Sequence, residues 1–144
     1  MKHFIFCMFF LAFSSTASAL DISDVGTYAV IRGDGYVTDY TFFISFINEK
    51  WSMEKKAADG TWSNVTCETD CIFRESNQND IARFFPAETL ATINTSCVHN
   101  TAFAFCSYTF KTEPEKKGHI FIALITKLPT PVALKKISEI RNAP

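Results

Sequence analysis

WSMEKKAADGTWSNVTCE, residues 51–68, carries the clearest fold signal in the chain. From Trp51 onward, apolar and polar residues alternate, as they do on a β-strand whose successive side chains point to opposite faces. The pair Asp59-Gly60 then interrupts the alternation, which resumes at Trp62. An Asp-Gly pair between two alternating runs is a strong signal for a tight hairpin turn. The stretch therefore predicts a β-hairpin over residues 51–66.

Similar patterns occur on both sides of this hairpin. VGTYAVI (25–31) and the residues near 39–47 have the composition and spacing of two further strands. TAFAFCSYTF and HIFIALIT form a second hairpin-like pair over residues 101–126, joined by the charged loop KTEPEKKG. The tail, residues 129–144, is ambiguous, because its apolar residues fit the spacing of a strand and of a helix.

A helical pattern lies between the two hairpins, near residues 79–93. Ile81, Phe84 and Phe85 fall on one side of a helix, and Pro86 either ends that turn or opens the next. We expect one helix broken at the proline, or two short ones. Strands, a helical segment and further strands predict an α+β domain on a mostly antiparallel sheet. A small open β-barrel is the alternative.

The beginning of the chain contains the three parts of a secretory signal peptide in order. Lys2 and His3 give a basic start, an apolar run follows, and Ala17-Ser18-Ala19 is an A-x-A cleavage pattern. The apolar run has about 10 residues, whereas a membrane-spanning helix needs about 20. We therefore expect residues 1–19 to be a signal peptide and residues 20–144 to form a single periplasmic or secreted domain.

Four cysteines remain after this cleavage. In a small exported domain, an even number of cysteines is typical of disulfides, and three connectivities are possible. We favour Cys67–Cys71 and Cys97–Cys106, because each pair closes a short loop. A zinc site made of the first three of these cysteines and His99 is the alternative. An oxidising compartment would consume those thiols, and Cys106 would be left over, so we expect neither a metal nor another cofactor.

Charge and motifs narrow the classes of function. The chain has 14 Lys and Arg against 15 Asp and Glu, without a block of like charge. Nucleic-acid binding relies on concentrated positive charge, so we expect no nucleic-acid partner. No apolar run after the leader is long enough for a membrane span. The sequence also lacks a phosphate-binding glycine loop, an H-E-x-x-H motif and a G-x-S-x-G motif, so we do not expect an enzyme.

These features favour a small exported protein that binds another protein. We predict a periplasmic inhibitor or immunity-type protein that blocks a partner such as a cell-wall hydrolase or a toxin. The residues expected to contact the partner are Trp62, Glu68, Thr69, Asp70 and His99. An acidic loop bounded by cysteines is loosely similar to the protruding loop of periplasmic lysozyme inhibitors, although here the spacing is shorter and no histidine lies between the cysteines. The oligomeric state stays open.

Two other functions are weighed against protein binding. The first is a carrier that holds a small apolar ligand in an aromatic-lined pocket, as occurs in the mouths of barrels. The residues that would line this pocket are Tyr40, Phe42, Phe103, Phe105 and Tyr108. The second is an enzyme with paired carboxylates, for which Glu68 with Asp70, and Glu113 with Glu115, are the candidates. Acids of this kind are more often simply solvated.

Overall fold

The computed structural model describes residues 19–65 and 70–141, and the structural statements below refer to these residues. In them, nine strands form one sheet in the order β4-β3-β2-β1-β9-β8-β7-β6-β5, and neighbouring strands pair antiparallel. The strands are β1 (Gly26–Ile31), β2 (Val37–Ile47), β3 (Lys50–Lys56), β4 (Trp62–Asn64), β5 (Arg74–Glu75), β6 (Ile93–His99), β7 (Phe103–Phe110), β8 (Glu113–Ala123) and β9 (Thr130–Ser138). The helices are the 3-10 helix η1 (Ile22–Asp24), α1 (Gln78–Phe84) and α2 (Ala87–Thr92).

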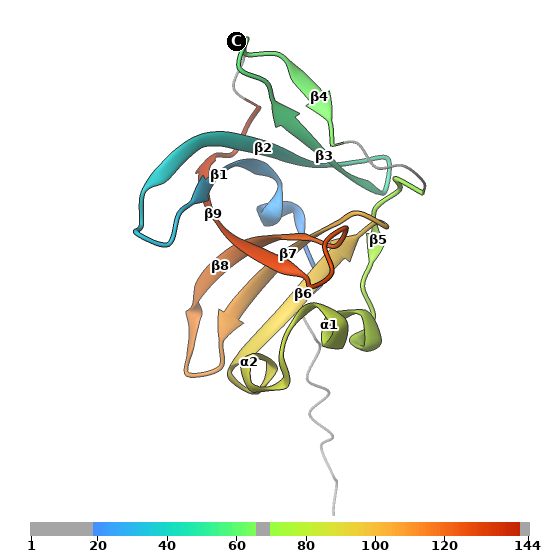
Figure 1. The fold of residues 1–144 in the computed structure, drawn as a ribbon, viewed down its shortest axis with the longest axis vertical. Coiled ribbons are helices and arrows are strands. Elements are labelled where there is room, and N and C mark those ends of the chain that lie inside the picture. Colours follow the sequence, from blue (N-terminus) through green and yellow to red (C-terminus); the bar gives the residue numbers. More distant parts are fainter. Residues whose placement is uncertain (1–18, 66–69, 142–144) are drawn as a thin grey trace, which may run out of the picture.

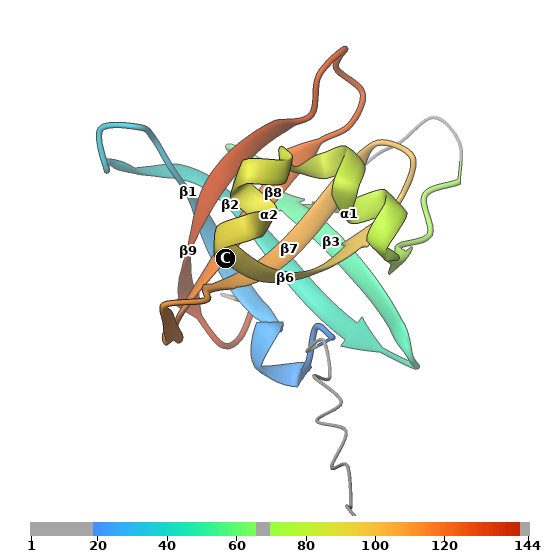
Figure 2. The same ribbon diagram turned by 90° about the horizontal axis from the view of Figure 1, so that it is seen from below.

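The sheet curls into a half-barrel, as Figures 1 and 2 show. The first strand pairs with the last, β1 with β9, in the middle of the sheet, while β4 and β5 are its two edges. All other strand pairs are consecutive in sequence, so the chain forms an up-and-down meander. The mostly antiparallel sheet is confirmed, and its curl fits the small open barrel. The α+β description holds only in part, because the two helices are short.

The interior of the half-barrel is filled by aromatic and aliphatic side chains. Phe42 and Phe103 both stack on Phe121, with ring centroids 4.9 and 5.2 Å apart. Tyr28 meets Phe105 edge to face at 5.2 Å, and both are fully buried. Aromatic pairs in such geometries stabilise a core beyond the area that they bury. In this part of the interior, side chains rather than open space lie between the strands.

A second core lies on the outer face of β6, β7 and β8, where α1 and α2 cross these strands (Figure 2). Ile81 and Phe84 of α1 pack there against Cys106 of β7 and Ile122 of β8. The helix begins at a capping box in which Asn77 and Asp80 satisfy each other's backbone amides. Because of this second core, β7 is buried on both faces, which explains its nearly continuous apolar sequence.

Both expected hairpins are present. β3 and β4 pair across a turn in which Gly60 adopts a left-handed φ of 87°, the conformation that makes glycine favourable in such turns. β7 and β8 form the second hairpin. Most of the charged segment expected as its loop is strand instead, because β8 begins at Glu113 and only Lys111 and Thr112 make the turn.

The helical segment and the tail need corrections. The two short helices on either side of Pro86 are confirmed. The predicted end of the helical segment, at residue 93, was wrong, because Ile93 begins strand β6. This strand was not expected at all. Its residues pair with β7 along their whole length, which a local pattern cannot reveal. The ambiguous tail contains a strand, β9, between β1 and β8.

One of the two expected disulfides is seen in full. Cys97 and Cys106 are bonded and join directly opposite residues of β6 and β7. Cys71 is also disulfide-bonded, whereas Cys67 lies outside the described residues. Since Cys97 is bonded to Cys106, it does not offer a thiolate for the zinc site considered above. Nor do residues 19–65 and 70–141 contain a cluster of His, Cys, Asp or Glu suited to a metal ion.

Two findings bear on the location of the protein. The disulfide is consistent with an extracellular or periplasmic location, since such compartments are oxidising. Among the helices of the described residues, none is both long and apolar enough to cross a membrane.

Candidate functional site

The two ends of the half-barrel differ in construction. At one end, here called the loop end, lie the connections 32–36, 57–61, 100–102 and 124–129, together with the segment 70–73. At the opposite end, here called the η1 end, lie η1 and the tight turns between β2 and β3 and between β7 and β8. Figure 2 shows the β8–β9 connection and η1 at opposite ends of the curled sheet. Asp70, the described residue of the acidic segment singled out in the sequence, belongs to the loop end.

A buried amide ties three segments of the loop end together. Asn100 is 1% exposed, and its Oδ1 accepts hydrogen bonds from the backbone N–H groups of Ala102 and Phe103, at 2.9 and 2.8 Å. Its Nδ2 donates to the carbonyl of Cys71 at 3.3 Å. The N–H of Leu124 donates to the carbonyl of Ala102 at 2.8 Å. The segment 70–73, the β6–β7 turn and the β8–β9 connection are therefore held in a fixed relation.

Asp70 and His99, two of the residues expected to contact a partner, are connected through Arg74. Asp70 has a left-handed φ of 50°, and its carboxylate forms an ion pair with Arg74. Arg74 on β5 is in turn the cross-strand partner of His99 on β6. These residues occupy one corner of the loop end, next to the start of α1. Glu68 and Thr69 lie outside the described residues.

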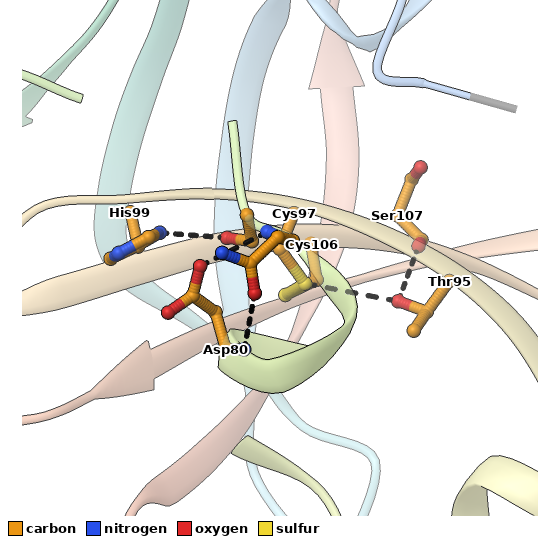
Figure 3. The surroundings of a disulfide bond; sticks show 8 residues. Asp80, Thr95, Cys97, His99, Cys106 and Ser107 are labelled. Atoms are coloured by element: carbon orange, nitrogen blue, oxygen red, sulfur yellow. Dashed lines mark hydrogen bonds between the residues drawn. A yellow bond between two sulfur atoms is a disulfide. The ribbon is translucent and has the colours of Figure 1, made fainter. Parts of the chain in front are cut away.

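His99 is engaged within the protein. Its Nδ1 lies 2.8 Å from the hydroxyl of Ser76, and its ring meets Phe84 edge to face at 5.5 Å. Figure 3 shows His99 in the surroundings of the disulfide between Cys97 and Cys106. Burial lowers the pKa of His99, and the nearby carboxylate of Asp80 opposes this effect only in part. The histidine is thus neutral at physiological pH. Its contacts position β5 against α1.

Trp62 belongs to a different group of contacts. It lies on β4 with its ring against Phe43, edge to face at 6.2 Å, on the outer side of the sheet. The charged groups of Lys56 and Arg141 lie over the ring, 5.7 and 5.8 Å from its centroid, in the arrangement of cation–π contacts. Arg141 also bonds to Glu54 at 3.2 Å. Trp62 therefore helps to hold the C-terminal segment on the outside of the half-barrel.

Large apolar side chains are exposed at the loop end, and the sequence analysis had singled out only Tyr40 among them, as a pocket residue. Their exposed fractions are 58% for Tyr36, 74% for Tyr40, 66% for Ile72, 71% for Ile125 and 77% for Leu128. Ile125 and Leu128 lie on the β8–β9 connection, where the hydroxyl of Thr126 bonds to the carbonyls of Ala123 and Leu128. The sequence LITKLPTP, residues 124–131, could have indicated the exposure of Ile125 and Leu128. Its apolar residues continue into a stretch rich in turn residues, which usually lies at the surface.

The residues expected to line a ligand pocket do not face one space. Phe42, Phe103 and Phe105 belong to the interior core or pack against it. Tyr40 is 74% exposed on the outlying part of β2. Tyr108 is the cross-strand partner of Gly118 and points to the outer face, since its neighbours along β7 alternate in direction.

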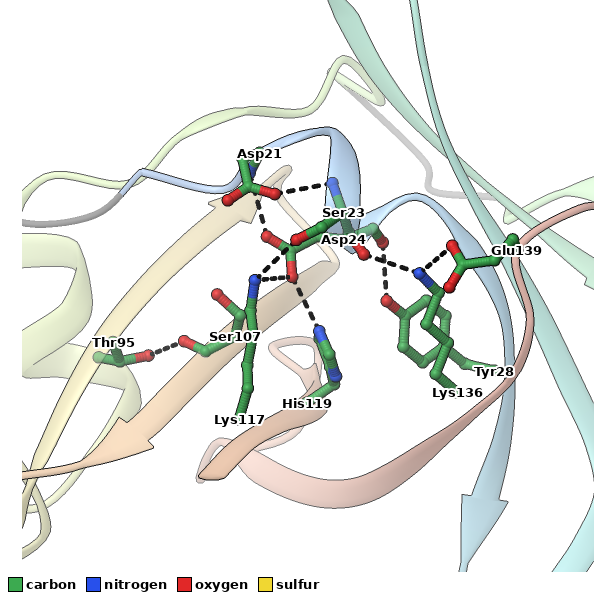
Figure 4. A network of polar contacts seen from close by, with 10 residues as sticks. All are labelled: Asp21, Ser23, Asp24, Tyr28, Thr95, Ser107, Lys117, His119, Lys136 and Glu139. Carbon is green, nitrogen blue, oxygen red and sulfur yellow. Dashed lines mark hydrogen bonds and ion pairs between the residues drawn. The ribbon is translucent and has the colours of Figure 1, made fainter. Parts of the chain in front are cut away.

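A buried polar network closes the η1 end (Figure 4). Asp24 is fully buried, and its Oδ1 accepts from Lys117 Nζ at 2.6 Å and from His119 Nε2 at 2.8 Å. Burial alone would raise the pKa of Asp24, but these two donors outweigh it and hold the pKa below its usual value. The carbonyl of Asp24 accepts from the hydroxyl of Tyr28 at 2.7 Å. These contacts fasten η1 across the end of the barrel.

No protein-family model, no curated protein and no solved structure matches this chain. The function must therefore follow from the side chains themselves. The loop end combines exposed apolar residues on separate, mutually bonded segments with an ion-paired polar corner. Exposed apolar side chains beside polar groups occur on surfaces that contact other proteins.

Proposed function

We propose that the protein is an exported, non-catalytic binding protein of the inhibitor or immunity type, which blocks a partner protein by means of its loop end. The observation that carries this proposal is the exposure of Ile72, Ile125 and Leu128 on two segments that Asn100 and its neighbours hold together. Scattered exposed apolar residues are normal, but several on connected loops at one end favour an interface.

The internal bonding of the loop end supports this function energetically. Binding a partner costs the free energy of ordering flexible loops and side chains. Here the β6–β7 turn, the segment 70–73 and the β8–β9 connection are already joined by hydrogen bonds in the free protein. A partner would therefore meet apolar side chains whose backbone is fixed beforehand, so more of the contact energy would become affinity.

The acids of the cysteine-bounded segment suit a basic partner, although Arg74 pairs with Asp70 and Lys127 lies between Ile125 and Leu128. Glu68 and Asp70 belong to the cysteine-bounded segment, and the second of them lies at the loop end next to Arg74. Complementary charge increases the rate of association and excludes partners of like charge. A cell-wall hydrolase or a toxin with a basic cleft would suit this surface.

The alternative, a carrier of a small apolar ligand, receives less support. The stacking of Phe42 and Phe103 on Phe121 fills the part of the interior where aromatic residues were expected to line a pocket. A carrier would have to move these rings apart on binding, whereas a protein partner can dock without any change in the core.

The proposal is tested by capture of a partner with matched variants. The domain starting at Leu20 is immobilised in oxidised form and exposed to lysates of the native organism and its competitors. The variant Ile125→Asp/Leu128→Asp places charge in the proposed interface. The control Ile47→Asp alters a residue of similar exposure, 65%, at the η1 end.

We expect one protein to be retained by the wild type and by the control, with at least a tenfold loss of affinity in the loop-end variant, since a buried charge in an interface costs more than about 1.4 kcal/mol. Inhibition of that protein's activity by the wild type alone would establish the inhibitor type. Equal retention by all three proteins would refute the role of the loop end. Retention of nothing, together with a rise in Tm on addition of apolar ligands, would favour the carrier.

A further inference from the structure

A small cavity of about 180 Å³ lies where the N-terminal segment meets the edge of the sheet. It adjoins the polar corner of the loop end, because Ser76 bonds to His99 and Glu75 follows Arg74. The residues that line it are Ala19, Leu20, Glu75, Ser76, Gln78, Ile81, Thr95, Ser96, Cys97 and Val98. They come from the N-terminal segment, the connection from β5 to α1, and β6, so three separate parts of the chain form its wall.

The N-terminal side of this wall is firmly anchored. Leu20 packs against the interior core. The next residue, Asp21, donates its N–H to the buried carboxylate of Asp24 at 3.0 Å, and its own side chain accepts from the N–H of Ser23 at 2.7 Å. Since Asp24 is held in turn by Lys117 and His119, the backbone at Asp21, directly after Leu20, is held in place.

The opposite side of the wall carries a carboxylate. Glu75 is the cross-strand partner of Val98, which belongs to the same core that Leu20 packs against. Directly opposite residues of a strand pair point to the same face, so the Glu75 side chain lies on the side of the sheet where Leu20 packs. None of the ten lining residues is basic. The Gln78 amide also lines the cavity, whereas the Ser76 hydroxyl is bonded to His99.

We propose that this cavity is the seat of the α-amino group of the processed protein. Cleavage after Ala19 by a signal peptidase adds water across the Ala19–Leu20 peptide bond, which leaves a carboxylate on the leader and an ammonium group on Leu20. The ammonium group then stands at the cavity with Glu75 as its counter-ion and the Gln78 amide oxygen as an acceptor.

Removal of the leader therefore creates an ion pair that the precursor lacks. Because Leu20 packs against the core and the backbone at Asp21 is held in place, little conformational freedom is lost when the pair forms. The processed chain is stabilised relative to the precursor, so the native state is favoured after export. This inference rests on the export that the proposed function includes, but not on the loop end or on any partner.

The test combines two forms of the N-terminus with substitutions of two acids. One form begins at Leu20, and the other retains Ser18-Ala19 in front of it. Glu75→Gln removes the proposed counter-ion with little change of shape, and Glu88→Gln is the control, an acid in the first turn of α2 that does not line the cavity. Tm is measured for all six proteins at neutral pH and low salt.

We expect Glu75→Gln to lower the Tm of the form that begins at Leu20 by about 2–4 °C, and that of the extended form by clearly less. Glu88→Gln should act equally on both forms. In addition, NMR titration of the methyl-labelled amine should give a pKa above the ordinary range of about 7.7–8.0, and Glu75→Gln should bring it back into that range.

Two results would overturn the proposal. One is an equal effect of Glu75→Gln on both forms, with an ordinary pKa of the α-amino group. The other is an exported protein whose mass shows that it begins at a residue other than Leu20.

Discussion

Asp24 Oδ1 and His119 Nε2 lie 2.8 Å apart, although 95 residues separate the two in the sequence. The same carboxylate oxygen lies 2.6 Å from Lys117 Nζ. This contact attaches η1 to β8 across the end of the half-barrel (Figure 4). A fully buried carboxylate is costly unless donors surround it, so the stability of the η1 end depends on this small network.

The first prediction concerns Asp24. The variant Asp24→Asn removes the negative charge that pairs with Lys117 and puts an amide NH2 in place of Oδ2, the acceptor of the Asp21 N–H. We expect the free energy of unfolding to fall by about 2–3 kcal/mol, because removal of one partner from a buried pair leaves the others unsatisfied. Urea unfolding followed by circular dichroism measures this difference.

The matched control is Asp34→Asn. Asp34 is paired with Arg32 at 2.6 Å, but both side chains are more than half exposed. An exposed pair contributes little, so the control should change stability by less than about 0.5 kcal/mol. If both variants had equal effects, the burial of Asp24 would not matter.

The second prediction concerns pH. The pKa values of His99 and Asp24 are both lower in the folded protein than in the unfolded chain. As the pH falls, the unfolded chain therefore takes up each proton first, and the free energy of unfolding decreases. The loss begins near the unfolded-state pKa values, at about pH 6.5 for histidine and about pH 4 for aspartate, and continues down to each folded-state pKa.

Two variants separate these ranges. His99→Gln should remove the loss that begins near pH 6.5. Asp24→Asn should reduce, but not abolish, the loss below about pH 4, because hydrogen bonds also lower the pKa values of Asp21 and Asp59. Chemical unfolding at a series of pH values provides the measurement. An unchanged profile for His99→Gln would contradict the neutral histidine described above.

The third prediction concerns the disulfide under the helices. Cys97 and Cys106 are nine positions apart, and a loop of about this length loses roughly 2–3 kcal/mol of stability when the bond is absent, in the chain-entropy model. The variant Cys97→Ala/Cys106→Ala should show this loss in urea unfolding. Added reductant should destabilise the wild type further than it destabilises the variant, because the variant has already lost one of the bonds.

The fourth prediction concerns Gly118 on β8. A Cβ atom at this position would overlap the ring of its cross-strand partner Tyr108. We expect Gly118→Ala to cost about 1–2 kcal/mol, since added volume forces neighbouring side chains to move. At Gly33, a Cβ atom would meet nothing within 4 Å, so Gly33→Ala is the control and should be nearly neutral.

A double variant identifies the cause. In the background of Tyr108→Ala, the substitution Gly118→Ala should no longer destabilise the protein, because the ring that it meets is absent. Additive effects of the two substitutions would instead indicate that the backbone of β8 requires glycine for another reason.

The elements with strong local signals could be predicted from the sequence. The Asp59-Gly60 turn and its two arms, the apolar strands, and the helices around Pro86 were all expected because their patterns depend on neighbouring residues alone. β6 was missed, because Ile93 also continues the helical spacing and only pairing with β7 makes it the start of a strand. The position of Trp62 on the outer face, under Arg141, likewise depends on a residue far along the chain.

The sequence by itself determined most of the classes of element and favoured, among three connectivities, the pairing of Cys97 with Cys106, because turns, apolar periodicity and short cysteine loops are local properties. Only the tertiary structure decided that β1 joins β9, that Asp24 meets His119, and that Ile72, Ile125 and Leu128 emerge at one end. The physical reason is that these relations arise when the sheet curls and brings distant segments together, and no short stretch of sequence encodes that closure.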